Sequence, residues 1–433
     1  MIIAATTLVL PIVLGQNFEN IHVGFPDAWH GDKYKELFCP STNIPKFLVI
    51  CFLRRLSAPP GKKLNHMIDA IGAIGSFHIS NGQVPTNPDS ARFHPNLDFW
   101  RVGNRILAGT EAPFWIGYEF DVPTLTDFKL FNFIEENDIF STPHPSMIPI
   151  SMAIHERSDS DGIIWGSFSA MNFEEQRFYQ VTRHCYPDIF TRSVLRKHTS
   201  SFPSHRCLSI RANLKNVRAL TLQTRLRKVV CGGMDFYDTM PLRFLIFNKK
   251  TQVFSTEQPL EVFPSMFVTH QLNAYNAPDG IITADMVVYD SHDSYTKYLY
   301  TDFLTKQLYP STARMLRFRI DTKKLRVMYS YILQQETIAA EFPQINHKME
   351  QKPYQWAYIV EHPFAAGNGI LKINVDEPAG TRNQVFKTES NLVVHEPWFV
   401  AKPSSRKEDD GILLVRALDV DEAKGKGARC QKM

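Results

Sequence analysis

The sequence predicts an all-β protein. Short runs of β-branched and aromatic residues, separated by turn residues, recur along the whole chain. The apolar spacing typical of amphipathic helices is hard to find after the first segment. Turns that favour hairpins, because their residues tolerate positive φ, adjoin several of these runs. They lie at Asn81-Gly82, Asp161-Gly162 and Asp279-Gly280.

One hairpin pattern occurs four times with irregular spacing. It consists of an apolar strand, an Asp or Asn, a few turn residues that often include Thr, and a returning apolar strand. The copies lie at residues 118–124, 244–251, 319–325 and 375–386. Repeated hairpins of this kind are typical of the blades of a β-propeller. The same turns also serve any other antiparallel all-β protein, so the pattern alone fits both.

The composition excludes several classes of protein. The chain has 433 residues, of which 44% are apolar and 21% charged, so it is neither disordered nor fibrous. Its 48 Lys and Arg against 44 Asp and Glu leave a net charge of only +4, and the basic residues are scattered, so we expect no nucleic-acid partner. The six cysteines form no Cys-x-x-Cys pair, which argues against a zinc ribbon and a thioredoxin-like site.

The chain divides into three segments. Residues 1–20 are a signal-like or first-strand segment, because residues 1–15 are apolar and uncharged but too short to span a bilayer as a helix. A secretory h-region without its basic flank and a buried first strand explain this segment equally well. Residues 21–418 form the expected β-propeller domain, and residues 419–433 form a charged, polar tail.

Histidines are the residues most able to carry chemistry. The chain contains no Gly-rich phosphate loop, no Gly-x-Ser-x-Gly elbow and no His-Glu-x-x-His. It does contain 15 histidines, and a metal site assembled from distant strands would use histidine without any short motif. A calcium loop after His155 fails, since Arg157 and Phe168 would take its first and last ligand positions.

Three segments carry a resemblance to a known family. Residues 267–275 read Phe-Val-Thr-His-Gln-Leu-Asn-Ala-Tyr, residues 341–346 read Glu-Phe-Pro-Gln-Ile-Asn, and residues 396–400 read Glu-Pro-Trp-Phe-Val. Together they resemble the carotenoid cleavage oxygenase family, and the Phe-Pro-Gln-Ile-Asn run resembles its animal branch, which includes β-carotene oxygenases and the retinal-pigment-epithelium isomerohydrolase. Residues 67–84 and 110–114 also resemble early segments of that family.

The resemblance implies a seven-bladed β-propeller with Fe(II) on its axis. Four histidines hold the metal in that family, and glutamates behind three of them orient the rings. Matching positions are His155, His205 and His270 for the ligands, and Glu111, Glu341 and Glu396 for the glutamates. His144, in a similar local sequence, is a rival to His155.

These residue types suit oxygen chemistry. Neutral imidazoles leave Fe(II) its full charge, and a carboxylate behind each ring fixes its tautomer and raises its basicity. Glutamates are more often solvated at strand ends, but Glu341 and Glu396 stand among apolar and aromatic neighbours. The resemblance further implies a carotenoid or apocarotenoid substrate, O₂ as co-substrate and peripheral contact with a membrane. We expect a cytoplasmic or peripheral membrane location, with secretion left open by residues 1–15.

The sequence departs from the family at the fourth ligand. In the family this histidine belongs to a His-Gly pair on the last strands, beyond the Glu-Pro-x-Phe motif. Only 433 − 396 = 37 residues follow Glu396 here, and none is histidine. This predicts a truncated C-terminus and an incomplete last blade. Two hypotheses follow: an iron-dependent carotenoid dioxygenase, or a catalytically inactive or truncated relative that at most binds an apolar ligand.

Overall fold

The computed structural model describes two parts of the chain in different detail. In residues 1–185 it describes the strands, and of their side chains only Ile106 and Ala108. In residues 236–419 it describes most of the chain, with gaps at 245, 249–252, 255–258, 294–312, 335–338, 364–366, 378 and 380–382. Residues 155, 205 and 420–433 lie outside the described residues.

The described strands of the first half form three sheets. The first sheet contains β1 (Ile2–Thr7), β2 (Leu37–Phe38), β3 (Phe47–Arg55), β4 (Gly72–Ser80), β5 (Gln83–Val84), β6 (Thr86–Asn87) and β7 (Arg92–Phe93). The second contains β8 (Asp98–Val102), β9 (Arg105–Gly109), β10 (Ile116–Asp121) and β11 (Thr126–Asn132). The third contains β12 (Met147–Met152), β13 (Arg157–Ser158), β14 (Ile164–Asn172) and β15 (Arg177–Cys185).

The second half contains two four-stranded meanders flanked by smaller sheets. Two short pairs come first: β16 (Leu242–Phe244) with β19 (Leu260–Val262), and β17 (Phe247–Asn248) with β18 (Val253–Phe254). The first meander is β20 (Phe267–Ala277), β21 (Ile281–Tyr289), β22 (Arg314–Asp321) and β23 (Arg326–Ile332). The second is β24 (Ala340–Ile345), β25 (Trp356–Glu361), β26 (Gly369–Asn374) and β27 (Gln384–Lys387). The last pair is β28 (Leu392–Ala401) with β29 (Gly411–Asp419), and two 3-10 turns are η4 (Pro278–Gly280) and η5 (His347–Met349).

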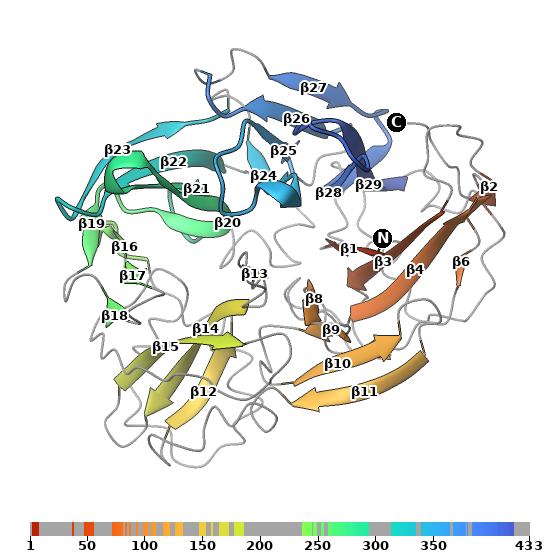
Figure 1. Cartoon of the computed structure of the whole chain (residues 1–433), viewed down its shortest axis with the longest axis horizontal. Helices are drawn as coiled ribbons and strands as arrows, with labels where there is room; N and C mark the ends of the chain where they lie inside the picture. Colours follow the sequence, from red (N-terminus) through yellow and green to blue (C-terminus); the bar gives the residue numbers. More distant parts are fainter. Residues whose placement is uncertain are drawn as a thin grey trace.

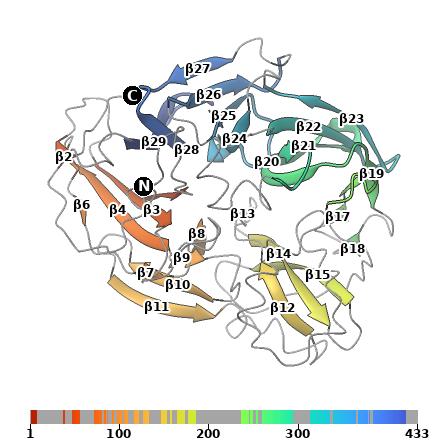
Figure 2. The ribbon, with the colours of Figure 1, turned by 180° about the vertical axis from the view of Figure 1, so that it is seen from behind.

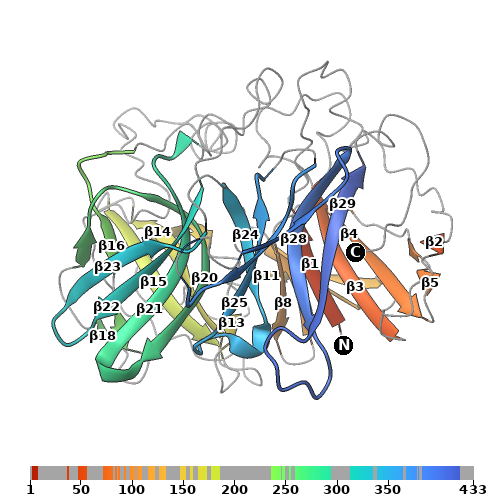
Figure 3. The same ribbon diagram turned by 90° about the horizontal axis from the view of Figure 1, so that it is seen from above.

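The sheets follow one another around a ring in chain order, from red and orange through green to blue (Figure 1). The view from behind shows the same ring (Figure 2). The ring closes where the first sheet meets the last strand pair, since β1 lies beside β28, as the view from above also shows (Figure 3). β1 pairs with β3 in parallel, so residues 2–7 form a strand. This arrangement is a β-propeller, which confirms the predicted fold class; the number of blades stays a prediction.

In the described part of the second half, neighbouring sheets pack face to face around hydrophobic clusters. Consecutive residues of a strand point to opposite faces, so one strand supplies two clusters. In β21, Val287 belongs to the same buried cluster as Ile359 of β25, whereas Val288 belongs to the cluster shared with β16 and β22. In β25, Val360 joins Phe399 of β28 in a third cluster. Burial on both faces explains the apolar character of these strands.

The repeated hairpin pattern is confirmed at three of its four places. Residues 118–124 join β10 to β11, residues 319–325 join β22 to β23, and residues 375–386 lead from β26 to β27. The hairpin predicted for residues 244–251 is wrong in part. β17 pairs with β18 there, but Phe244 ends β16, which pairs with β19 instead.

Asp321 shows why an acidic residue begins this turn. Its Oδ1 accepts hydrogen bonds from the backbone N–H groups of Lys323 and Lys324, at 3.0 and 2.9 Å. A side chain that caps its own turn in this way stabilises the reversal. The Thr322 hydroxyl donates to Gly280 O at 2.7 Å and ties this turn to the one before β21.

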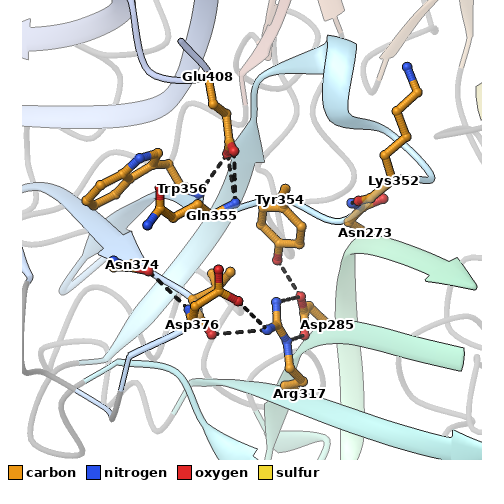
Figure 4. A network of polar contacts seen from close by, with 11 residues as sticks. Asn273, Asp285, Arg317, Lys352, Tyr354, Gln355, Trp356, Asn374, Asp376 and Glu408 are labelled. Carbon is orange, nitrogen blue, oxygen red and sulfur yellow. Dashed lines mark hydrogen bonds and ion pairs between the residues drawn. The ribbon is translucent and has the colours of Figure 1, made fainter. Parts of the chain in front are cut away.

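A buried ion pair joins the two meanders (Figure 4). Asp285 of β21 and Arg317 of β22 are cross-strand neighbours, and the Arg317 Nε and Nη2 each donate to the Asp285 carboxylate at 2.8 Å. The Tyr354 hydroxyl, from the loop before β25, also donates to Asp285. Arg317 Nη1 donates to Val375 O at 3.0 Å. Each group in this network therefore has a partner on the facing sheet or strand.

Within the described residues, no helix is both long enough and apolar enough to cross a bilayer.

Candidate metal centre

The candidate site lies on the first strands of consecutive sheets. β20 and β24 lie toward the middle of the ring, whereas β23 and β27 lie at its rim (Figure 1). β20 is adjacent to β24, and β24 is adjacent to β28. Three of the six predicted site residues lie on these strands: His270 on β20, Glu341 on β24 and Glu396 on β28.

The structure brings His270 and Glu341 into direct contact. His270 Nδ1 lies 2.7 Å from Glu341 Oε2. The His270 side chain is 27% exposed, and that of Glu341 only 4% exposed. An ionised carboxylate can only accept, so Nδ1 carries the proton and donates it. In the neutral ring the lone pair then resides on Nε2, the nitrogen that can bind a metal.

Bulges in both strands aim these side chains. The β20–β21 register shifts between Val268 and His270, so Thr269 is the extra residue of a bulge. Without a bulge, Thr269 and His270 would point to opposite faces of the sheet. Both instead contact Glu341, since the Thr269 hydroxyl donates to its Oε1 at 2.7 Å. Bulges re-aim side chains and are frequent beside functional sites.

On β24, the backbone irregularity that corresponds to the β20 bulge lies at Phe342. The β24–β25 register shifts between Glu341 and Gln344, and Phe342 has a φ of 55°, which a bulky residue rarely adopts. Its N–H donates to Glu341 Oε2 at 3.1 Å, and its ring packs edge-on against His270 with centroids 5.5 Å apart. The strained residue thus contacts both members of the pair.

The surroundings of Glu341 favour its ionised form. Burial of this carboxyl opposes ionisation, but the charge of protonated His270 and hydrogen bonds from His270, Thr269 and Tyr289 outweigh it. These contacts hold the pKa of Glu341 below its usual range. With the Phe342 N–H, four donors surround a group that has about four acceptor directions.

Glu396 reaches this region indirectly. Its Oε1 accepts a hydrogen bond from Gln344, a buried residue three positions beyond Glu341 on β24. Glu396 also stands at a bulge, since the β28–β29 register shifts between Val394 and Pro397. The structure therefore connects Glu396 to the strand of Glu341.

The remaining predicted residues lie outside the described residues. These are the ligands His155 and His205, the rival His144, and Glu111. Among the described residues, no three side chains of the metal-binding types gather into one group. The assignment of these residues as ligands and supporting glutamates therefore stays a prediction.

Sequence reasoning missed two residues of the site, Thr269 and Tyr289. Thr269 directly precedes His270 in the sequence, and this position is the one signal that could have identified it as a site residue. Tyr289 carries no such signal, because only the pairing of β20 with β21 places it opposite Phe267 and within reach of Glu341.

Among the described residues, one proposed ligand, His270, has surroundings that fit an iron site. A ring held through Nδ1 by a buried, ionised carboxylate is the arrangement that metal-binding histidines use. Imidazole nitrogen also suits Fe(II). His270 therefore has the chemistry of an iron ligand.

Fold and site together define a class: an all-β propeller with a histidine–carboxylate pair on its inner strands. Within that class, the family model described as retinal pigment epithelial membrane protein matches residues 208–427, just over half of the chain. The chain belongs to this family, which is the carotenoid cleavage oxygenase family that the motifs predict.

Individual relatives agree with this assignment. The β,β-carotene 15,15'-dioxygenase of Rattus norvegicus is 26% identical over 187 residues, which cover 37% of this chain and 32% of that protein. The carotenoid isomerooxygenase of Galleria mellonella is 25% identical over 174 residues, which cover 39% of this chain and 33% of that protein. The matches thus span about a third of the length of these relatives.

Solved structures share the fold at low identity. A mutant of Synechocystis apocarotenoid oxygenase superposes with a TM-score of 0.65 at 16% identity, covering 88% of this chain and 86% of that chain. The cobalt-substituted Synechocystis enzyme gives a TM-score of 0.61 at 17% identity, covering 86% and 84%. At such identities the likeness shows the propeller fold alone.

Proposed function

We propose that this chain is a non-haem Fe(II)-dependent oxygenase that cleaves a conjugated double bond of a carotenoid or apocarotenoid. The observation that carries this proposal is the Glu341 carboxylate held 2.7 Å from His270 Nδ1 on the inner strands. His155, His205 and His270 would hold the metal, and Glu111, Glu341 and Glu396 would orient ligands. Bound iron would supply the binding and activation of O₂, which no side chain offers.

The reaction balances without an external reductant. The C=C bond of the polyene and the O=O bond both break, and two C=O bonds form, which yields aldehyde or ketone products. Within this chain, Glu341 keeps the proton on Nδ1 of His270, and Phe342 packs against the ring. These two residues thus fix the ring orientation.

The substrate class rests on family membership and on the relatives, which are named for carotene or carotenoid chemistry. A long polyene is apolar and partitions into membranes, so we include peripheral membrane contact in the proposal. Two adjacent residues of the rim strand β27, Val385 and Phe386, are each 44% exposed and suit such contact.

A second function stays in view: a catalytically inactive or truncated member of the family that at most binds an apolar ligand. His270 is the one proposed ligand among the described residues, and a single histidine would be a weak metal site. The two functions differ in whether the protein takes up iron.

Iron uptake tests the proposal. The full chain, purified without metal and reconstituted anaerobically with Fe(II), is expected to retain about one iron per chain and to cleave a carotenoid or apocarotenoid under O₂. His270→Ala should weaken iron binding by at least about 10–100-fold and abolish product formation. The matched control is His362→Asn, which changes an exposed histidine whose φ of 45° asparagine tolerates.

Two results would contradict the proposal. Iron near zero in the reconstituted wild-type chain would remove the oxygenase function and leave the apolar-ligand alternative. Full iron content and unchanged product formation in His270→Ala would show that His270 is not a ligand. The control variant should behave like the wild-type chain in both measurements.

A further inference from the structure

Two hydroxyl groups hold the Glu341 carboxylate in addition to His270. Thr269 Oγ1 donates to Oε1 at 2.7 Å, and the Tyr289 hydroxyl is a further donor. His270 and the Phe342 N–H both donate to the other oxygen, Oε2. The carboxylate is therefore held through both of its oxygens.

The strand geometry makes these contacts a built feature. Thr269 is the extra residue of a bulge, and that bulge is what lets it share a partner with its neighbour His270. Tyr289 is 3% exposed and ends β21, opposite Phe267. A bulge residue and a buried tyrosine thus converge on one carboxylate of the neighbouring sheet.

We propose that Thr269 and Tyr289 are positioning residues for the iron site. Their hydroxyls hold the Glu341 carboxylate against the His270 Nδ1–H, and this presents the lone pair of Nε2 to the metal. The role rests on the proposed function, because it assumes that His270 is a ligand. Without the two donors, the carboxylate can rotate away, and the ring can then adopt the other tautomer, with its proton on Nε2.

The tautomer can be measured without any metal. In metal-free protein labelled with ¹⁵N-histidine, the His270 signals are assigned by their loss in His270→Ala. The pH is raised until the His270 shifts stop changing; Nδ1 should then give the shift of a protonated nitrogen and Nε2 that of an unprotonated one. Thr269→Val and Tyr289→Phe should each move both shifts toward a tautomer mixture. Thr269→Ser, which keeps the hydroxyl, should restore the wild-type shifts.

Metal affinity supplies the second readout. Fe(II) and Co(II) binding should weaken about tenfold in Thr269→Val and in Tyr289→Phe, and more in the double variant. Two controls remove buried hydroxyls elsewhere in the same interface. Thr283→Val removes a hydroxyl that has no hydrogen-bond partner among the described residues, and Tyr354→Phe removes a donor to the other buried carboxylate, Asp285.

The outcomes separate this role from a merely structural one. Tyr354→Phe should lower the unfolding midpoint but leave the His270 shifts and the metal affinity unchanged. If the wild-type chain binds metal while Thr269→Val and Tyr289→Phe keep both its tautomer and its affinity, the positioning role is wrong. If the wild-type chain binds neither Fe(II) nor Co(II), the proposed iron function fails, even where the tautomer responds to the substitutions.

Discussion

Two buried carboxylates, Glu341 and Asp285, face the same interface between the two meanders, but their partners differ. Asp285 pairs with Arg317, and the two side chains are 0% and 3% exposed. Glu341 pairs with His270, whose side chain is 27% exposed. Arginine has donors only and stays charged, so its pair is closed to ligands. Histidine can donate from one nitrogen and accept at the other, so its pair can bind a metal.

The pKa shifts in the Asp285 network also indicate a pair that does not bind ligands. Burial alone would lower the pKa of Arg317, but the hydrogen bonds and charge of Asp285 outweigh burial and raise it. Burial and the Asp285 charge raise the pKa of Tyr354 as well, so its hydroxyl stays a donor. Arg317 and Tyr354 therefore both keep their protons across the ordinary pH range. The comparison indicates that Asp285 and Arg317 hold the sheets together, whereas Glu341 holds the ring of His270.

The largest effect should come from breaking the closed pair. Arg317→Met leaves the Asp285 charge buried without its partner and should lower the free energy of unfolding by about 3–5 kcal/mol. Denaturant titration followed by circular dichroism measures this loss. The double variant Arg317→Met, Asp285→Leu should lose less than the single one, because it leaves no buried charge. A loss below about 1 kcal/mol in Arg317→Met would show that the pair does not hold the sheets together.

An intermediate effect is expected from Asn273, three residues beyond His270 on β20. Its side chain accepts from Gln351 N at 2.9 Å and donates to Met349 O and Lys352 O at 3.2 and 3.1 Å. Asn273→Ala should cost about 1–2 kcal/mol of unfolding free energy, because these backbone groups lose their partner but lie near water. Iron affinity should not change, since the lost contacts lie on the loop after β24.

The control for Asn273 is Asn276→Ala, an exposed position on the same strand that should change stability by less than about 0.5 kcal/mol. Equal losses in the two variants would show that the Asn273 contacts carry no stability. A fall in iron affinity in Asn273→Ala alone would show that the Asn273 contacts are coupled to His270.

The sequence located both members of one carboxylate pair, without predicting that they contact each other, and missed the other pair. His270 and Glu341 stand in segments with a recognisable order of residue types, so the family resemblance located both. Asp285 and Arg317 stand in strands that read as ordinary alternation, and only the register of β21 against β22 makes them partners. Tyr289 was missed for the same reason. Turn chemistry predicted the hairpins, since a turn depends on a few neighbouring residues, whereas bulges and cross-sheet contacts depend on the packed fold.

A third set of polar contacts, made by two acidic residues of a loop, lies closer to solvent than the two buried pairs. The loop between β28 and β29 is held to the β24–β27 sheet by Glu408 and Asp409. Glu408 accepts from the backbone N–H groups of Gln355 and Trp356 at 2.7 to 3.0 Å (Figure 4). Lys372 donates to Asp409 at 2.7 Å, and its ammonium lies 4.1 Å from the centroid of the Trp356 ring.

The two acids of this loop shift in opposite directions. The hydrogen bond from Lys372 lowers the pKa of Asp409, with the Lys372 charge adding to it. Burial raises the pKa of Glu408 despite its backbone donors. A lowered pKa means that Asp409 adds stability above the pKa of an unfolded aspartate, about 3.9, and loses that contribution as the pH falls. Glu408 has the opposite sign, since its contribution declines as the pH rises.

The smallest effect should therefore appear in Asp409→Asn, and only at higher pH. Near neutral pH this variant should be less stable than the wild-type chain by up to about 1 kcal/mol. The effect is small because the Lys372 and Asp409 side chains are 21% and 31% exposed, so solvent screens their attraction. The difference should shrink as the pH falls below about 5, and it should vanish only below the lowered pKa of folded Asp409, where this residue is protonated in both folded and unfolded chains. Glu408 is present in both proteins, so most of its opposite slope cancels in the difference; the Asp409 charge is only the smallest of the causes that act on the raised pKa of Glu408. Urea midpoints measured across this range test the sign, and a difference that grows toward low pH would contradict the Lys372–Asp409 contact.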